Sequence, residues 1–292
     1  MNARRRRTRL TRAGWNVLAY ASLAALAATI LLPLGWMITT ALKPDSAPVF
    51  TPTPQWFPTE YWNWENFGRA LLDPNRPFWR YSLNTVLIVT LNIIGTVVSC
   101  SLVGYAFARL RFRGREFLFG ILIITMLVPW QVLLIPQFLL YYNLGWYGTN
   151  LPLWVAAFFA SGSAGGGFFI FLIRQYIRSI PVELELAARI DGANQFQVFW
   201  YIVLPLIRPV LTVCIVFVFL ICWGDLLGPL VYLLRDQDFT IAIGIANMVS
   251  IKDPHLNLLM AANLIMMIPA TVLYFLAQKQ LVGGIASVGL KG

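Results

Sequence analysis

The segment from Phe117 to Ile173, FLFGILIITMLVPWQVLLIPQFLLYYNLGWYGTNLPLWVAAFFASGSAGGGFFIFLI, contains no Asp, Glu, Lys or Arg. Its 57 residues are too many for one crossing, because a helix needs roughly 20 residues to cross the hydrocarbon core of a bilayer. The run divides at Tyr141–Asn150, where aromatic and turn-forming residues suit a membrane–water interface. The segment therefore predicts two membrane-spanning helices, one on each side of residues 141–150.

Four more stretches that are nearly free of charge predict four more spans, at residues 13–42, 81–108, 209–234 and 254–278. The 292 residues are 59% hydrophobic and 12% charged, with a mean hydropathy of +0.70. A soluble domain has about 45–50% apolar and about 25% charged residues. This composition excludes a soluble enzyme and a disordered chain. We expect an all-α membrane protein with six transmembrane helices.

The first stretch follows a basic cluster that includes Arg4–Arg7, as in a cleaved signal peptide. It is much longer than the roughly 7–15 apolar residues of a signal peptide, so we expect a retained span. With six spans, both termini lie on one side. Placing that side in the cytoplasm puts 16 Lys and Arg inside and six outside, as the positive-inside rule requires. The net charge of +10 then reflects topology and attraction to anionic lipid, not binding to nucleic acid.

The predicted organisation begins with a basic cytoplasmic N-terminus (1–12), a first span (13–42) and an outer loop (43–80). A core permease domain with five spans (81–282) and a cytoplasmic tail (283–292) follow. The outer loop holds seven Pro and four Trp residues. Two interpretations of this loop remain open: an irregular cap on the membrane surface, or a docking surface for a partner outside the cell.

The chain lacks the residue patterns of common catalytic and metal sites. No Lys is followed by Ser or Thr, so a phosphate-binding loop of the Walker A type is absent. His255 is the single histidine, which excludes a His-based metal cluster and a Ser-His-Asp set. The three cysteines lie in apolar segments without CxxC spacing, which favours a packing role. We expect no enzymatic activity, and no cofactor or metal bound by this chain.

Amide side chains within the predicted spans have two interpretations, helix–helix packing or the lining of a translocation path. These residues are Asn84, Asn92, Gln131, Gln137 and Asn263. Asp225 is the one acid inside an apolar run, and such an acid is a functional candidate by default. It lies 17 residues after Arg208, which is about 25 Å along a helix and places it near the outer interface. We therefore expect an interfacial or packing role for Asp225 rather than a proton relay.

Residues 174–208 form the longest predicted inner segment, and their pattern is that of two helices joined by a turn. Pro181 suits the first turn of a helix. Glu185 and Arg189 have the spacing of an i,i+4 ion pair. Gly192 fits the left-handed residue that follows a helix. The first helix is therefore predicted to end just before Gly192.

The second helix of this segment is predicted to begin at Asn194, which can cap it. Its apolar stripe has the spacing i, i+3, i+4 and i+7 and consists of Phe196, Phe199, Trp200 and Val203. Leu204-Pro205 is predicted to end it. An amphipathic pair of this kind can insert into a groove on another protein.

The pattern Glu-x-Ala-Ala-Arg-Ile-Asp-Gly-Ala, followed by Ile-Val-Leu-Pro-Leu, resembles the EAA loop of ATP-binding-cassette importer permeases. It is most similar to the carbohydrate-uptake subfamily, of the type of the maltose permease G subunit. Matches to that family extend over nearly the whole chain and include Leu83-Asn84-Thr85, Gly104–Arg115, Met126–Pro129, Ile135-Pro136 and Gly289–Gly292. The resemblance implies a type I importer permease fold in the inner membrane of a bacterial cell.

In that family the EAA helix pair inserts into a cleft of a cytoplasmic ATPase and transmits closure of the ATPase dimer to the spans. The resemblance implies this coupling role for Glu183, Glu185, Ala187, Ala188, Asp191, Gly192, Ala193, Leu204 and Pro205. It also implies a second homologous permease, ATPase subunits that bind ATP and Mg, and a solute-binding protein outside. The implied solute is a sugar or polyol.

The chain departs from the family pattern at Leu186, where the family usually has Glu, so a hydrophobic contact can replace a charged contact with the ATPase. Gly224 stands where the family commonly has Asn. Two alternatives remain: a permease of the same superfamily for a solute such as glycerol phosphate, or a stand-alone secondary transporter. The predicted spans offer no basic residue for an anionic solute, and Asp225 gives little support for an intramembrane ion site.

Overall fold

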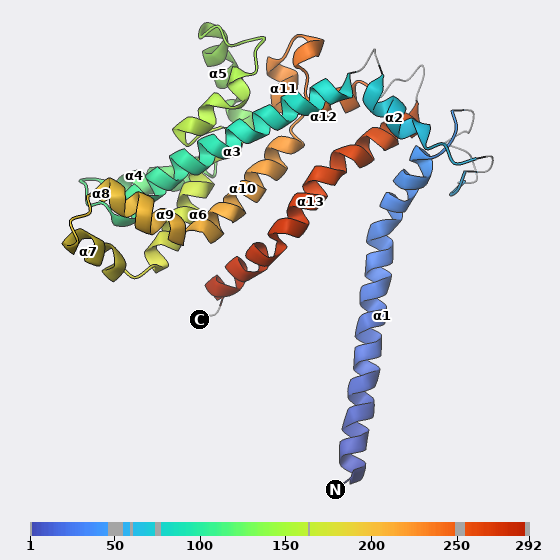
Figure 1. The fold of residues 1–292 in the computed structure, drawn as a ribbon, viewed down its shortest axis with the longest axis horizontal. Helices are drawn as coiled ribbons and strands as arrows, with labels where there is room; N and C mark the ends of the chain where they lie inside the picture. The colour runs from blue at the N-terminus through green and yellow to red at the C-terminus, as the bar shows by residue number, and fades with distance from the viewer. Residues whose placement is uncertain are drawn as a thin grey trace. The chain divides into compact units, whose positions relative to one another are not determined.

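The computed structural model describes residues 2–45, 55–58, 61–73, 77–162, 164–248 and 255–289, with side chains from residue 15 to residue 278. Every regular element in these ranges is a helix, which confirms the all-α class (Figure 1). Two compact units make up the chain. The first comprises residues 1–73 and 248–265, and the second comprises residues 74–247 and 266–292.

The first unit contains α1 (Asn2–Ala41), α2 (Glu65–Leu72) and the first turns of α13 (Leu256–Gly289). Within α1, residues Trp15–Ala41 have a mean hydropathy of 2.1, and the most apolar window is fully exposed. The sequence predicts a span over residues 13–42, and the helix is present at that place. Such exposed apolar surface on a single helix is expected of a segment that lies in lipid or against another membrane protein.

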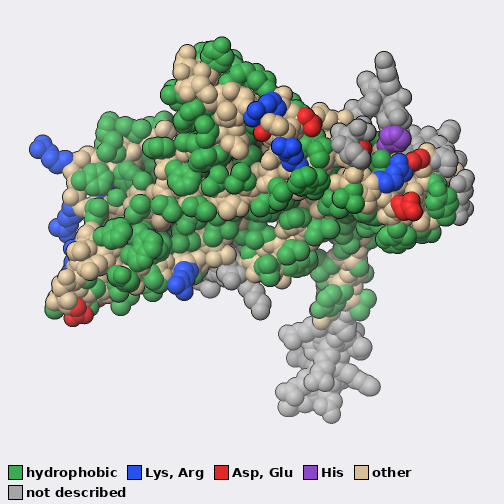
Figure 2. All heavy atoms as spheres, turned by 45° about the horizontal axis from the view of Figure 1, so that its top comes forward, with side chains coloured by type: hydrophobic (Ala, Val, Ile, Leu, Met, Phe, Trp, Pro, Cys, Tyr) green, Lys and Arg blue, Asp and Glu red, His purple; other side chains and the backbone are tan. Residues whose placement is uncertain are grey.

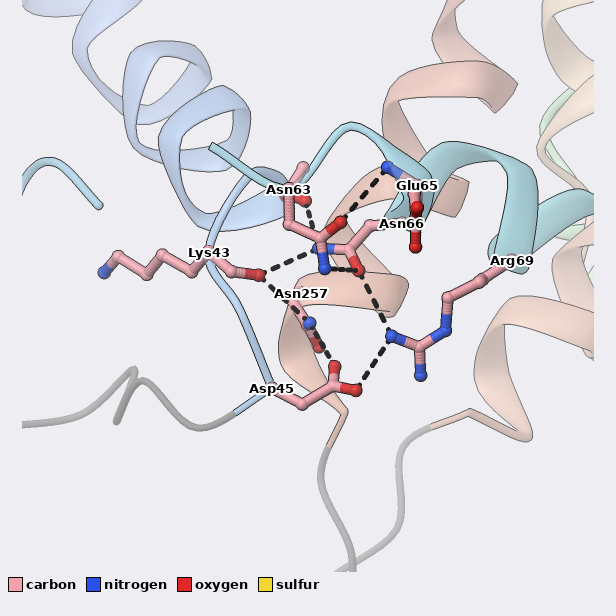
Figure 3. Close-up of polar contacts among 8 residues, drawn as sticks. Lys43, Asp45, Asn63, Glu65, Asn66, Arg69 and Asn257 are labelled. Carbon is pink, nitrogen blue, oxygen red and sulfur yellow. Dashed lines mark hydrogen bonds and ion pairs between the residues drawn. The ribbon is translucent and has the colours of Figure 1, made fainter. Parts of the chain in front are cut away.

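A cluster of polar side chains joins the three helices of the first unit, and we call it the amide cluster: Lys43, Asp45, Asn63, Asn66, Arg69 and Asn257 (Figure 3). Lys43, Asn66 and Asn257 are its buried members. The Asn66 Nδ2 group donates to the carbonyl oxygens of Ala41 and Lys43, both at 2.8 Å. The last carbonyls of a helix have no partner within it, and Asn66 supplies one for α1. Asn66 is fully buried, so this cap is protected from water.

The other half of the amide cluster fixes Asp45. The Asn257 Nδ2 group donates to the carbonyl of Lys43 at 3.2 Å and to Oδ1 of Asp45 at 2.6 Å. Arg69 forms an ion pair with the other carboxylate oxygen of Asp45 at 2.8 Å. Partial burial raises the pKa of Asp45, but the hydrogen bonds from Asn257 and Arg69 and the Arg69 charge outweigh it. The pKa of Asp45 is therefore below its usual value.

The second unit is built around α3 (Phe78–Arg109), which packs against α6 (Gly166–Ser179), η2 (Val155–Phe159) and α10 (Arg208–Trp223). Glycines allow the close approach on both sides of α3. A Cβ at Gly95 would lie 2.8 Å from the ring of Phe158, and a Cβ at Gly104 would lie 2.9 Å from Ile173. The core between these helices consists largely of aliphatic and aromatic side chains, among them Phe169, Ile173, Val198, Val203 and Val218.

Among the described residues, three helices are long and apolar enough to cross a membrane: Trp15–Ala41, Phe78–Arg109 and Leu256–Gln278. Two pairs of helices would each qualify if counted as one bent span. The first is α4 (Arg115–Thr125) with α5 (Trp130–Asn143), bent by 100°. The second runs from Gln195 to Trp223 and is bent by 74°. Hydrophobic side chains cover most of the face shown in Figure 2, as expected of a protein whose solvent is largely lipid.

The predicted span over residues 151–173 is not one regular helix. This stretch begins with two short 3-10 helices, η1 (Leu151–Leu153) and η2, and α6 starts only at Gly166. Ala160 and Gly165 between them have positive φ values of 53° and 77°, which end a regular helix. At Gly166 a side chain would collide with the carbonyl of Ala160. Gly165 and Gly166 therefore allow the chain to turn into the start of α6.

The predicted span over residues 209–234 is also divided. It consists of α10 and α11 (Leu227–Tyr232), with Asp225 between them. The Asp225 Oδ1 atom accepts a hydrogen bond from the backbone N–H of Gly228 at 3.2 Å, in the manner of a side chain that caps the start of a helix. The described part of this unit also includes η4 (Asp236–Asp238) and α12 (Ile241–Ala246).

Candidate functional site

The segment after α6 forms a helical hairpin, here called the hairpin, from Glu183 to Leu206. Its first arm is α7 (Glu183–Ile190). Its second arm is continuous through α8 (Gln195–Gln197), the π-helical η3 (Val198–Val203) and α9 (Leu204–Leu206). The two arms pack against each other. The predicted helix–turn–helix is confirmed, with corrections to its details.

The turn of the hairpin depends on Gly192, whose φ is +89°. The N–H of Ala193 donates to the carbonyl of Ala188 at 2.9 Å, and the N–H of Gly192 donates to that of Arg189 at 3.0 Å. These two bonds define a Schellman motif, in which the residue after the helix is left-handed. The prediction for Gly192 is confirmed. Pro181 lies before the helix rather than in its first turn, because α7 begins at Glu183.

The second arm begins with a capping box at Asn194. Its side chain accepts from the N–H of Gln197 at 3.0 Å, and the Gln197 side chain accepts from the N–H of Asn194 at 2.8 Å. Both hydrogen bonds satisfy N–H groups that a helix leaves without partners at its start. The predicted cap is confirmed.

The predicted apolar stripe of the second arm is wrong in two of its four members. Val198, Phe199 and Val203 are buried, whereas Phe196 and Trp200 are 65% and 52% exposed and stack on each other. The stripe assumed 3.6 residues per turn, but residues 198–203 form a π-helix with i→i+5 hydrogen bonds. This register places Val198 and Val203 on the same side. The arm also extends one residue beyond Pro205, to Leu206.

The hairpin presents a wide apolar surface to its surroundings. The exposed apolar side chains are Val182, Leu184, Leu186, Ile190, Phe196, Trp200, Tyr201 and Leu206. Ile190 is the most exposed, at 87%. Exposed apolar patches of this kind mark surfaces that bind another protein or a membrane. We call this set of side chains the docking surface.

The residues expected to couple the chain to the ATPase differ in how far they are exposed. Glu183, Ala187, Asp191 and Gly192 are exposed, and Ala188, Ala193, Leu204 and Pro205 are half-buried. Glu185 is different, because it is only 2% exposed. Its predicted ion pair with Arg189 is wrong: Arg109, at the end of α3, forms the ion pair with Glu185 instead. Arg189 donates to the side chain of Gln195 at 2.7 Å.

Among the amides expected to pack or to line a path, the two in α3 bond to backbone carbonyls. Asn84 donates to Gln237 and Phe239 at 2.9 and 3.0 Å. Asn92, which is buried, donates to Ile88 and Leu153 at 2.9 and 2.8 Å. These bonds join α3 to segments far along the chain.

The remaining three amides are not brought to one place by contacts in the structure. Gln131 is exposed near the start of α5, and Asn263 donates to the carbonyl of Leu259 in its own helix at 2.8 Å. Gln137 borders a cavity of about 30 Å³ together with Asp225 and Tyr232. Asp225, whose predicted place was near an interface, thus lies beside one of the candidate path residues.

Long apolar helices with an exposed apolar hairpin are typical of a multi-pass membrane protein with a surface for another protein or for lipid. Residues 100–286 match the model of the family described as "Binding-protein-dependent transport system inner membrane component". The chain belongs to this family, and it is a multi-pass permease of an ATP-binding-cassette importer. The family recognised from the EAA loop is thereby confirmed.

Curated relatives and a solved structure agree with this assignment. The arabinooligosaccharides transport system permease protein AraQ of Halalkalibacterium halodurans is 31% identical over 74% of this chain and 75% of that protein. The osmoprotective compounds uptake permease protein GgtD of Synechocystis is 35% identical over 72% and 69%. A bacterial ABC transporter involved in the import of the acidic polysaccharide alginate has a chain of the same fold. Its TM-score is 0.78 at 21% identity, covering 92% of this chain and 97% of that one.

Proposed function

We propose that the chain is one of two permease subunits of an importer for a sugar or polyol, and that its hairpin couples ATP hydrolysis to transport. The docking surface carries this proposal. Its apolar side chains have no cover in the described chain, and the two helices beneath them are rigidly capped by Gly192 and Asn194. A helix pair that is fixed in shape and apolar on its outside suits a groove on another protein.

The proposed complex contains a second homologous permease, two cytoplasmic ATPase subunits that hold ATP and Mg, and a solute-binding protein outside the membrane. The family name supports a binding-protein-dependent system. The name of the relative AraQ, an arabinooligosaccharides transport system permease protein, supports a sugar as solute. In this proposal the chain crosses the membrane six times and keeps both termini in the cytoplasm. The three long helices and the two bent pairs then account for five spans, and the segment that ends in α6 supplies the sixth.

The docking surface also indicates the chemistry of its partner. Leu186, at the position of the usual family Glu, is 49% exposed and lies on the same arm as Leu184 and Ile190. An apolar side chain at the centre of an interface gains from an apolar partner and loses if it covers a charge. We therefore propose that the ATPase offers an apolar pocket at this point.

We also propose that polar side chains of this chain line part of the translocation path for the solute. Gln131 and Gln137 lie in α5, and Gln137 shares its small cavity with Asp225. Polar groups next to a cavity inside a membrane protein are candidates for contact with solute or water.

Affinity purification of the tagged chain from native membranes, followed by mass spectrometry, tests the proposal. The unaltered chain should bring a second permease, an ATPase and a solute-binding protein. Ile190→Asp should lose the ATPase but keep the second permease, because a charge then enters an apolar interface. Leu72→Asp, at a site 72% exposed on α2, is the matched control and should keep the ATPase. An unaltered chain that purifies alone, yet supports uptake after reconstitution, would establish the stand-alone transporter instead.

A further inference from the structure

The buried carboxylate of Glu185 connects the hairpin to the end of α3. The Arg109 Nε group donates to one oxygen of Glu185 at 2.5 Å, and the Tyr105 hydroxyl donates to the other at 3.4 Å. Arg109 is in the last turn of α3, and Tyr105 is one turn before it. The side chains of Arg109 and Glu185 are 12% and 3% exposed. Glu185 therefore has no surface left for a partner protein.

Two further hydrogen bonds extend this connection. The Arg109 Nη2 group donates to the carbonyl of Ile180 at 2.6 Å, directly after the end of α6. The Gln195 side chain donates to the Tyr105 hydroxyl at 2.6 Å, at the start of the second arm. The end of α3 is thus bonded to the end of α6 and to both arms of the hairpin. We call Tyr105, Arg109, Glu185 and Gln195 the joint.

An ion pair at this place is not needed for stability alone. Two buried charges lose their hydration, and apolar side chains of similar volume often replace such a pair without loss of stability. The ion pair fixes the relative orientation of the two segments that it connects, because charge-assisted hydrogen bonds are short and depend on angle. Apolar side chains can slide past one another, whereas the joint holds the hairpin and α3 in one relative orientation.

We infer that the joint transmits movement of the hairpin to α3, with Arg109 and Glu185 as its positioning residues. This inference rests on the coupling function proposed above. Movement of the ATPase displaces the hairpin through the docking surface, and the ion pair between Arg109 and Glu185 then displaces the end of α3. The rest of α3 passes it on, because Gly104 lies against Ile173 of α6 and Gly95 against the η2 segment. Glu185 acts inside the permease and not as a contact with the ATPase.

The test uses the whole complex, purified through the tagged chain and placed in lipid nanodiscs. A fluorescent label is attached at Leu83→Cys on α3, where the native side chain is 59% exposed. The native cysteines at 100, 214 and 222 are buried, so the label is selective. The change in label emission on adding ATP, Mg and orthovanadate reports movement of α3. ATPase association and ATP hydrolysis are measured on the same samples.

The informative variant is Arg109→Met with Glu185→Met, which removes the ion pair and keeps apolar volume in its place. We expect the ATPase to stay bound and to hydrolyse ATP, while the emission change falls by at least about five-fold, the lower end of typical coupling between sites. Arg109→Lys, which keeps the charge, should recover part of the response. Arg113→Met, on the exposed loop after α3, is the control and should leave it unchanged.

Two results would overturn the inference. An unchanged emission response in the double Met variant would show that packing alone transmits the movement. Loss of the ATPase from that variant would show that the ion pair only shapes the docking surface. Neither result is confused with failure of the proposed function, because that failure appears in the unaltered chain as absence of the ATPase.

Discussion

The amide cluster of the first unit and the joint of the second both bury polar side chains in an apolar chain, but they use different chemistry. In the amide cluster, the buried Asn66 and Asn257 donate mainly to backbone carbonyls, and the ion pair between Arg69 and Asp45 is about 40% exposed. In the joint, side chains bond chiefly to side chains, with an ion pair at the centre. Every residue has a backbone carbonyl that can accept a hydrogen bond, so the acceptors of the amide cluster do not depend on particular side chains. The joint depends on four particular residues, which suits a place where the orientation of two helices carries function.

The largest effect is expected from Gly192→Val, which changes the turn between the two arms of the hairpin and so disturbs the joint. A Cβ at Gly192 would meet no atom within 4 Å, so the whole effect comes from the φ of +89°. A β-branched residue there costs about 1–3 kcal/mol of strain, which relaxation of the turn would relieve by displacing α7 from the joint. We expect loss of substrate uptake with the complex still assembled. Gly192→Asn is the control, because Asn tolerates the left-handed region, and it should retain uptake. Normal uptake by the Val variant would contradict the role of the turn.

A smaller effect is expected for Asn66→Leu, which removes the donor that caps α1. The carbonyl of Ala41 loses the hydrogen bond from Asn66, at a cost of about 1–3 kcal/mol, whereas the carbonyl of Lys43 keeps the one from Asn257. We expect a lower melting temperature of the purified complex. The amount of solute transported per ATP hydrolysed should be unchanged. Asn63→Ala, on a half-buried side chain nearby, should lower the melting temperature less. If Asn66→Leu lowered the amount of solute transported per ATP hydrolysed, the amide cluster would also set a helix orientation that transport requires, as we infer for the joint.

Acid is expected to weaken the amide cluster. The pKa of Asp45 is below its usual value in the folded chain, so its stabilising contribution is present above the unfolded pKa of about 3.9 and is lost as pH falls through the folded value. The melting temperature should therefore drop more between pH 6 and pH 3 in the unaltered chain than in Asp45→Asn. Because Arg69 and Asp45 are about 40% exposed, salt screening should make this effect small. Equal pH dependence of the two chains would contradict it.

The smallest effect is expected for Leu186→Glu. The side chain is 49% exposed, so folding and the joint should be unaffected. We expect the ATPase to remain bound, with affinity reduced by at most about ten-fold because one charge faces an apolar pocket. Binding measured by surface plasmon resonance with the purified ATPase checks this. Stronger binding than in the unaltered chain would show that the pocket carries a cation and that Leu186 is not matched to it.

Features decided by neighbouring residues were predictable from the sequence. Gly192 and Asn194 follow local rules for helix ends, and the long spans follow from apolar length. The partner of Glu185 was not predictable, because Arg109 lies 76 residues away and Arg189 has the favourable local spacing. The π-helical register was missed for a similar reason, since the apolar pattern at residues 196–203 fits an α-helix. The path from Phe159 to Gly166 is set by contacts that only the folded chain reveals.

The π-helical turn at Val198–Val203 has a consequence for how this chain tolerates changes of length. Successive residues of an α-helix differ by about 100° around its axis, and a π-turn holds one residue more than the α register does. Deleting a single residue such as Tyr201 would let this turn return to α-helical geometry, and the later side chains of the arm would keep their directions, because the wider π-turn already accommodates the extra residue. The π-turn therefore lets this arm hold one residue more than an α-helix would, without changing the direction in which the side chains after it point.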